Sequence, residues 1–202
     1  MSSLAPKIMI VRHAEKPADQ GSPHGVDING KQDPESLIPL GWQRAGGLAA
    51  FFAPSNGIFK SPEIVKPQYL FASGVGKHSN SLRPQETITP TSQKLGIKIN
   101  TTFAKGDESA LAAAIVQCPG VVLVAWEHQD IPSIANAIVG NATTVPQQWS
   151  PGHCNATTVP QQWPGDRFDL VWVFDLKAST GRYGFSQIPQ LLLAGDLPSP
   201  IS

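Results

Sequence analysis

The stretch Lys7-Ile8-Met9-Ile10-Val11-Arg12-His13 decides how this chain folds. It is an almost wholly apolar β-type run that breaks abruptly at two cationic residues. A buried central strand of a parallel sheet ends in this way, because both of its faces are covered until the chain leaves the sheet. The run at 121–126 is the most hydrophobic of the chain and predicts a second strand of the same kind.

Strand and helix patterns alternate along the sequence. The predicted strands cover 7–11, 68–73, 98–103, 121–126 and, as the last strand, 170–175. The predicted helices cover 40–52, a segment beginning near 83, 107–116 with Asp107 as N-cap, and 130–140 with Asp130 as cap. This alternation predicts an α/β protein, a three-layer α/β/α sandwich around a mostly parallel sheet.

Length and composition favour one soluble domain. The 202 residues carry 15 Lys plus Arg and 15 Asp plus Glu, so the formal net charge is zero. We expect a single domain over 1–202 that binds no nucleic acid, since nucleic-acid binding needs a basic field. No apolar run approaches the roughly 20 residues that span a bilayer, and no signal peptide opens the chain, so we expect a cytoplasmic protein without membrane contact. Cys118 and Cys154 are expected to be free thiols.

Two long irregular segments interrupt the alternation. The Gly- and Pro-rich stretch 17–39 has no periodicity and is expected to border a site. The sequence of 141–149 recurs letter for letter at 155–163, an offset of 14. We interpret this tandem duplication as an insertion in a surface loop at about 141–168, because loop insertions cost little closure entropy. Both loops are expected to shape substrate access.

Cationic side chains follow three of the predicted strands. Arg12 and His13 follow the first strand, Arg83 lies beyond the second, and His128 follows the strand at 121–126. Ligands of an open parallel sheet bind outside the carboxyl ends of its strands, so these groups can converge. Guanidinium forks bind phosphate oxygens in a bidentate manner and imidazoles add further donors. The constellation therefore indicates phosphoryl chemistry.

The same segments resemble the motifs of the histidine phosphatase superfamily, the phosphoglycerate mutase-like proteins. Residues 12–17 (Arg-His-Ala-Glu-Lys-Pro) resemble a variant of the arginine-histidine signature, and 79–87 resemble the Ser-x-x-x-Arg-x-x-x-Thr motif. His128 matches the second histidine of the family. The match covers residues 8 to about 140 in the expected order.

The resemblance implies a role for each matching residue. His13 would attack phosphorus and become a phosphohistidine, while Arg12, Arg83 and His128 would hold the equatorial oxygens. Electrostatics alone adds that nearby arginines depress the pKa of His13, which keeps the attacking nitrogen neutral. We expect a phosphatase of a small phosphorylated metabolite, or as a second choice of a phosphohistidine protein, that needs neither metal nor cofactor. Its partner would be a small-molecule phosphate ester.

Substrate contacts are assigned less directly. Lys16 is a candidate for binding a substrate anion. The family serine could be Ser73 or Ser79, and Ser79 has the better spacing.

Two carboxylates are candidates for the general acid, Glu108 as the first choice and Glu127 as the second. Glu108 follows the third predicted strand, where mutase-like relatives carry the acid, but it also suits the first turn of a helix. Glu127 is adjacent to His128, although neighbouring side chains on a strand point to opposite faces.

Two alternative functions also remain at this stage. One is a catalytically weak phosphate-binding or regulatory protein, and the other is a phosphomutase. Ala14 stands where the mutase-type signature has Gly, which argues against mutase activity. The oligomeric state is left open.

Overall fold

A six-stranded sheet forms the centre of the part of the chain that the structure, a computed structural model, describes, namely residues 4–18, 20–140 and 159–202. The strand order is β3-β2-β4-β1-β5-β6, with parallel pairing from β3 to β1 and antiparallel pairing of β5 with both β1 and β6. The strands are β1 (Lys7–Arg12), β2 (Tyr69–Ala72), β3 (Ile99–Asn100), β4 (Val122–Trp126), β5 (Leu170–Lys177) and β6 (Arg182–Pro189).

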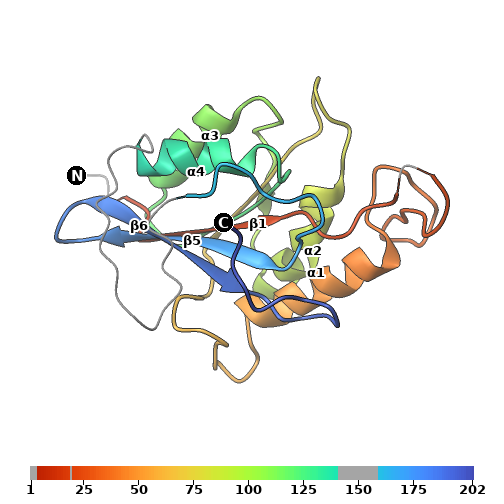
Figure 1. The fold of residues 1–202 in the computed structure, drawn as a ribbon, viewed down its shortest axis with the longest axis horizontal. Coiled ribbons are helices and arrows are strands. Elements are labelled where there is room, and N and C mark those ends of the chain that lie inside the picture. The colour runs from red at the N-terminus through yellow and green to blue at the C-terminus, as the bar shows by residue number, and fades with distance from the viewer. Residues whose placement is uncertain (1–3, 19, 141–158) are drawn as a thin grey trace.

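Helices cover both faces of this sheet (Figure 1), so the predicted three-layer α/β/α architecture and the mostly parallel sheet are confirmed. The helices are α1 (Pro39–Phe52), α2 (Arg83–Leu95), α3 (Glu108–Val116) and α4 (Ile131–Val139). Side chains of α1 and α2 pack with Met9 and Val11 on one face, and those of α3 and α4 pack with Ile8 and Ile10 on the other. Strand β1 is therefore buried on both sides, as its continuous apolar run predicts.

The register of β1 fixes what lies at its carboxyl end. Arg12 pairs with Trp126 of β4, and the backbone N–H of His13 donates to the Trp126 carbonyl at 2.9 Å. On the other side, Val11 pairs with Val171 near the start of β5. Because β5 runs antiparallel to β1, the residues just before β5 meet the residues just after β1.

The antiparallel hairpin of β5 and β6 is the main departure from the expected fold. The strand at 170–175 was expected to be the last, but β6 follows it and pairs with it over all eight residues. Residues 170–174 are buried on both faces, so their pattern does not reveal the direction of the strand. Strand β6 mixes polar and apolar residues and contains Gly184, which made it inconspicuous in the sequence.

Asp107 and Asp130 occupy the N-cap positions of α3 and α4, as expected. Neither of them makes a side-chain cap hydrogen bond to its helix. Asp107 instead accepts from the Ala104 N–H at 3.0 Å, and Asp130 lies 3.4 Å from the Lys105 ammonium. Local loop contacts thus competed successfully for both carboxylates.

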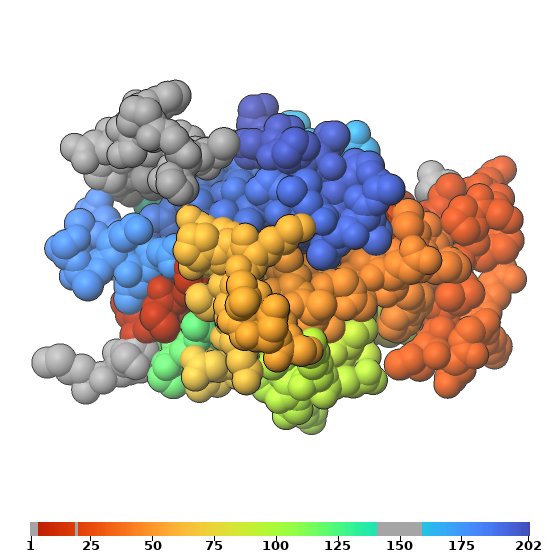
Figure 2. Space-filling view, turned by 90° about the horizontal axis from the view of Figure 1, so that it is seen from below, coloured from red at the N-terminus to blue at the C-terminus, as the bar shows by residue number. Residues whose placement is uncertain are grey.

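The C-terminal segment packs along α1 (Figure 2). Arg44 of α1 pairs with Asp196, and a side chain placed at Gly47 would meet the Leu192 side chain at 3.3 Å. Cys118 is a free thiol, as expected. The expectations for Cys154 and for most of the duplicated loop fall at 141–158 and lie outside the described residues.

Candidate active site

His13 lies at the carboxyl end of β1 and is only 4% exposed. Its Nδ1 is 2.8 Å from the carbonyl oxygen of Ala14. A carbonyl can only accept, so Nδ1 carries the proton and Nε2 presents a lone pair. Burial and the neighbouring Arg12 guanidinium lower the pKa of His13 to about 3. The ring is therefore neutral at physiological pH, the state that a nucleophilic histidine requires.

Arg12 offers two unused donors beside His13. Its Nη1 donates to the carbonyl oxygens of Pro164, Gly165 and Arg167 at 3.2, 2.8 and 3.0 Å. Its Nε and Nη2 are buried and have no hydrogen-bond partner among the described residues. Burial lowers the pKa of Arg12 to about 10, so the group stays charged at neutral pH. A buried cation whose Nε and Nη2 nitrogens both lack a partner is suited to binding an anion.

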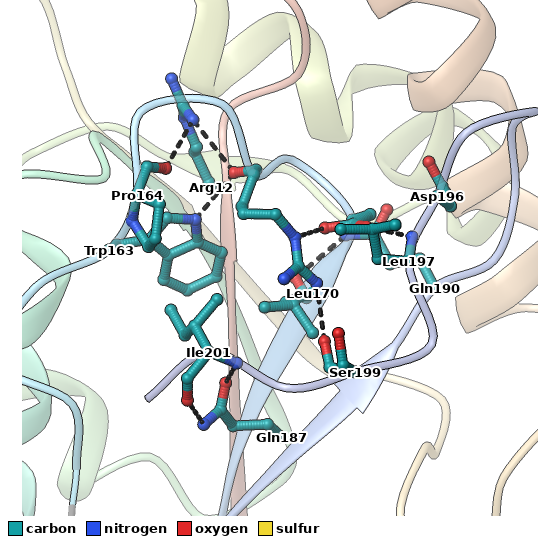
Figure 3. Close-up of polar contacts among 12 residues, drawn as sticks. Arg12, Trp163, Pro164, Leu170, Gln187, Gln190, Asp196, Leu197, Ser199 and Ile201 are labelled. Carbon is teal, nitrogen blue, oxygen red and sulfur yellow. Dashed lines mark hydrogen bonds and ion pairs between the residues drawn. The ribbon is translucent and has the colours of Figure 1, made fainter.

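The carbonyl oxygens that accept from Arg12 belong to residues 164–167, and further hydrogen bonds hold this segment in place (Figure 3). The Arg167 carbonyl also accepts from the Trp163 indole at 2.8 Å. The Arg167 guanidinium binds the Asp169 carboxylate at 2.7 Å and the Ser199 carbonyl at 2.8 Å. A continuous series of polar contacts thus connects Arg12 to the C-terminal segment.

Phe168 completes this side of the site. Its ring centroid lies 3.7 Å from the Arg12 guanidinium carbon, a cation–π contact. The same ring meets the imidazole of His13 edge-on, with centroids 6.1 Å apart. Phe168 therefore restricts the positions that both groups can adopt.

Arg83 is the first residue of α2 and also acts on His13. Its guanidinium donates to the Pro34 carbonyl at 2.6 Å and to the Ser36 carbonyl at 3.4 Å. Its charge contributes to the lowered pKa of His13. Glu86 supports the same loop, because its carboxylate accepts from the Ser36 hydroxyl at 2.7 Å.

Thr87 links α2 to the residue after His13. Its hydroxyl oxygen accepts from the Ala14 N–H at 2.8 Å and donates to the Arg83 carbonyl at 2.7 Å. Ala14 supplies the carbonyl that orients His13, so Thr87 helps to fix the position of His13 through Ala14. The sequence pointed to Thr87 only as the last position of a motif.

His128 follows β4 and is half-buried. Burial and the charges of Arg12, Lys16 and Lys105 lower the pKa of His128 to about 4, so this imidazole is also neutral. Its Nδ1 is buried without a hydrogen-bond partner among the described residues. A side chain placed at Gly165 would meet His128 Nε2 at 3.8 Å. The segment that holds Arg12 therefore also borders His128.

Glu127 is the buried carboxyl group at the end of β4. It is 8% exposed, and neither carboxylate oxygen has a hydrogen-bond partner among the residues described. Burial raises the pKa of Glu127, and the charge of Lys105 only partly offsets this. Paired residues of β1 and β4, such as Val11 and Ala125, pack on the same face of the sheet. Glu127 follows Trp126, the last residue of β4, and the charged groups that act on it are Lys105 and Asp130.

Glu108 has a different environment, at the start of α3. One carboxylate oxygen accepts from the Gly106 N–H at 2.9 Å and from the Trp126 indole at 3.2 Å. This carboxylate thus anchors α3 to the last residue of β4.

The remaining sequence candidates lie at the border of the site. Lys16 is exposed, and its charge reaches His128. The Ser79 hydroxyl oxygen accepts from the Ser81 N–H at 3.2 Å, which is a local turn contact. Ser73 is fully buried at the end of β2, and its hydroxyl group acts on the Glu127 carboxylate. The roles of Lys16 and Ser79 in substrate binding stay predictions.

A buried ion cluster next to His13 was not predicted. Arg44 donates to Glu15 at 2.7 and 2.9 Å, to Asp196 at 2.8 and 3.1 Å, and to Gln190 at 3.0 Å. Arg44 and Asp196 are 152 positions apart, so no local pattern reveals their contact. The one available signal was Arg44 itself, a cation on the apolar face of a predicted helix.

Neither a metal-binding group nor a membrane-spanning helix occurs in the described residues, 4–18, 20–140 and 159–202. None of their His, Cys, Asp and Glu side chains form a group of three that could hold a metal ion. Within the same ranges, every helix is too short or too polar to cross a membrane.

Comparison with known proteins identifies the fold. No family model matches the sequence, and no curated protein matches it. Solved structures do match. The protein histidine phosphatase SixA complexed with tungstate aligns with a TM-score of 0.50 and 14% identity, covering 91% of this chain and 97% of that one. A putative phosphohistidine phosphatase SixA from Nakamurella multipartitia aligns with a TM-score of 0.50 and 14% identity, covering 92% and 96%. The fold is therefore that of histidine phosphatases, as the sequence motifs implied.

Proposed function

We propose that this chain is a phosphatase that hydrolyses small phosphate monoesters through a phosphohistidine on His13. One observation carries the proposal: a buried, neutral His13 with its Nε2 lone pair available lies beside a buried Arg12 that has two unused N–H donors. The first group suits attack on phosphorus, and the second suits a phosphate dianion. The SixA fold and the motif resemblance support the same chemistry.

The reaction divides into two displacements at phosphorus. His13 Nε2 forms a bond to phosphorus while the bond to the ester oxygen breaks, and the leaving alkoxide takes a proton. Water then attacks phosphorus, the phosphorus–nitrogen bond breaks, and phosphate leaves with His13 regenerated. Arg12, Arg83 and His128 hold the phosphoryl oxygens and oppose the charge that develops on them. We propose that no metal ion takes part.

Glu127 is our proposed proton donor. A general acid must hold its proton near neutral pH, and burial shifts the pKa of Glu127 in that direction. Its two oxygens have no hydrogen-bond partner among the described residues, so the group is available. Glu108 fits this role less well, because the Trp126 indole and the Gly106 N–H both donate to one of its oxygens. After the first step, the Glu127 carboxylate accepts the proton of the attacking water.

The proposed function is tested by hydrolysis of p-nitrophenyl phosphate in the presence of EDTA. We expect turnover in the wild type, acid-labile phosphate on the trapped protein, and loss of both in His13→Ala. His24→Ala, which changes an exposed loop histidine, is the matched control and should retain activity. Activity that survives His13→Ala would refute the histidine nucleophile.

Two further measurements on the wild type test the alternatives, a phosphate-binding protein and a phosphomutase. An inactive wild type that still binds vanadate would favour a phosphate-binding protein. A phosphoenzyme that returns its phosphoryl group to a sugar acid faster than to water would favour a mutase. One observation supports hydrolysis over simple binding: Nε2 of His13 is left with its lone pair by the contact to Ala14.

A further inference from the structure

A cavity of about 410 Å³ lies next to the candidate active site, at the edge of the sheet where β1 ends and β5 begins. Phe168 is part of its wall and also contacts Arg12 and His13. The proposed chemistry does not use this cavity. Its charged lining residues are Glu15, Arg44, Asp166, Arg167, Asp169 and Asp196.

The charges of the lining leave negative groups in excess. Four carboxylates face two guanidinium groups. The Arg44 guanidinium donates its hydrogen bonds to Glu15, Asp196 and Gln190. Arg167 likewise donates to the carboxylate beside it and to a backbone carbonyl. Neither arginine therefore offers the cavity a strong site for an anion.

Two carboxylates retain unused capacity to accept hydrogen bonds. Glu15 is 9% exposed, and its Oε2 is buried without a hydrogen-bond partner in the described part of the chain. Asp166 is exposed and lines the cavity, so its carboxylate is accessible to a ligand there. A buried carboxylate oxygen without a partner is costly, and a cationic donor would satisfy it.

The position of Asp166 connects the cavity to the proposed phosphate position. Asp166 lies between Gly165 and Arg167, whose carbonyl oxygens both bind Arg12. The charges of Asp166 and Glu15 both act on the Arg12 guanidinium. A ligand held by the free donors of Arg12 therefore has the acidic cavity as its neighbour.

We propose that this cavity binds the positively charged end of the substrate, so that the substrate class is phosphate esters carrying an ammonium or guanidinium group. The proposal rests on the proposed function for the phosphate end only. An organic cation fits better than a metal ion, because the described carboxylates do not cluster in a metal-binding arrangement.

The test compares matched esters that differ only in charge. Phosphoethanolamine and aminobutyl phosphate carry an ammonium group, and glycol phosphate and hydroxybutyl phosphate are their neutral counterparts. We expect at least one ammonium ester to have a kcat/KM about tenfold above its counterpart in the wild type, the value of one charged hydrogen bond. In Asp166→Asn this ratio should fall to about threefold or less. Asp175→Asn, at the opposite end of β5, should keep the wild-type ratio.

Calorimetric binding of the same esters to His13→Ala provides a readout that needs no turnover. Tighter binding of an ammonium ester supports the cavity proposal, even if the wild type hydrolyses none of the esters and the proposed function fails. If the wild type hydrolyses the esters without preference and His13→Ala binds them equally, the cavity proposal is overturned and the proposed function stands. Absence of binding by all four esters also overturns the cavity proposal.

Discussion

At the scale of single residues, Glu127 and Glu108 lie in different environments near the carboxyl end of β4, and these environments suit different roles. Glu108 is held by two N–H donors and joins α3 to β4. Glu127 is buried and its pKa is raised, although the nearby Ser73 hydroxyl group partly offsets this shift. Neither carboxylate oxygen has a hydrogen-bond partner among the described residues. Burial favours the protonated form of the Glu127 carboxyl group over the charged form. A general acid must hold a proton that it can donate, so this environment suits that role.

We predict that Glu127→Gln lowers kcat by about a hundredfold for alkyl phosphates, whose leaving oxygen needs a proton. The loss should be much smaller for p-nitrophenyl phosphate, because nitrophenolate leaves without protonation. Steady-state kinetics over a series of leaving groups measures this. Glu108→Gln is the matched control and should affect both substrates alike. Equal losses on both substrates in Glu127→Gln would show that Glu127 is not the acid.

His13 also predicts a dependence of stability on pH. Its folded pKa, about 3, lies below the ordinary value of 6.5. Between these values the unfolded chain binds a proton that the folded chain does not, so stability decreases as pH falls. We expect this residue to remove about 2 kcal/mol of unfolding free energy between pH 7 and pH 5.

Urea denaturation at these two pH values measures the effect. His13→Gln should lose less stability on acidification than the wild type, while His24→Gln should lose as much as the wild type. Parallel losses in wild type and His13→Gln would contradict the buried neutral state of His13.

The sequence predicted the site residues whose position depends on the order of the strands. It did not predict those whose position depends on contacts between distant parts of the chain. Arg12 and His13 lie at the carboxyl end of β1, and His128 lies two residues after β4, so the order of elements alone placed them at one edge of the sheet. Glu15 and Arg44 were not assigned their roles, because their importance depends on Asp196, a partner brought close only by the folded chain. A local sequence pattern cannot predict a contact between Arg44 and Asp196, which are 152 positions apart.

At the scale of elements, a buried ion pair between Arg44 and Asp196 joins α1 to the segment after β6. Arg44 is 4% exposed as a side chain, and it neutralises Glu15 and Asp196. We predict that Arg44→Leu costs about 3–5 kcal/mol of unfolding free energy, because two carboxylates stay buried without their cation. Chemical denaturation measures the loss. Lys7→Leu, which breaks the more exposed pair with Asp175, should cost about 1 kcal/mol or less. Similar costs for both variants would contradict the importance of the buried cluster.

Element prediction succeeded where one pattern dominated and failed where two patterns compete. The apolar run of β1 and the spacing of α1 left no alternative. Strand β3 shortened to two residues at the edge of the sheet. The direction of β5 and the existence of β6 depend on pairing partners, so the composition of either segment was insufficient.

At the scale of the whole molecule, the C-terminal segment supports the site from a distance. Ile201 is 6% exposed, exchanges two backbone hydrogen bonds with the Gln187 side chain, and lies near Ser199, which binds Arg167. We predict that removing residues 199–202 lowers the unfolding free energy by about 2–4 kcal/mol, through lost apolar burial and hydrogen bonds.

The same truncation should lower kcat/KM for p-nitrophenyl phosphate, because Arg167 then holds the Arg12 segment less firmly. Thermal denaturation and kinetics on the truncated chain check the two effects. Leu197→Ala, which shortens a half-exposed side chain in the same segment, is the control and should change neither. Unchanged activity in a destabilised but folded truncation would show that the segment supports the fold alone.

The contacts of Arg12 have a consequence for the growing chain on the ribosome. His13 and Arg12 emerge early, whereas the carbonyl oxygens that hold Arg12 belong to residues 164–167, more than 150 positions later. A nascent chain that already contains β1 to β4 has His13 and Arg12 but lacks the carbonyl oxygens that orient the Arg12 guanidinium. Phosphate binding should therefore arise late in translation and in one step, so that partly synthesised chains neither capture nor cleave phosphate esters.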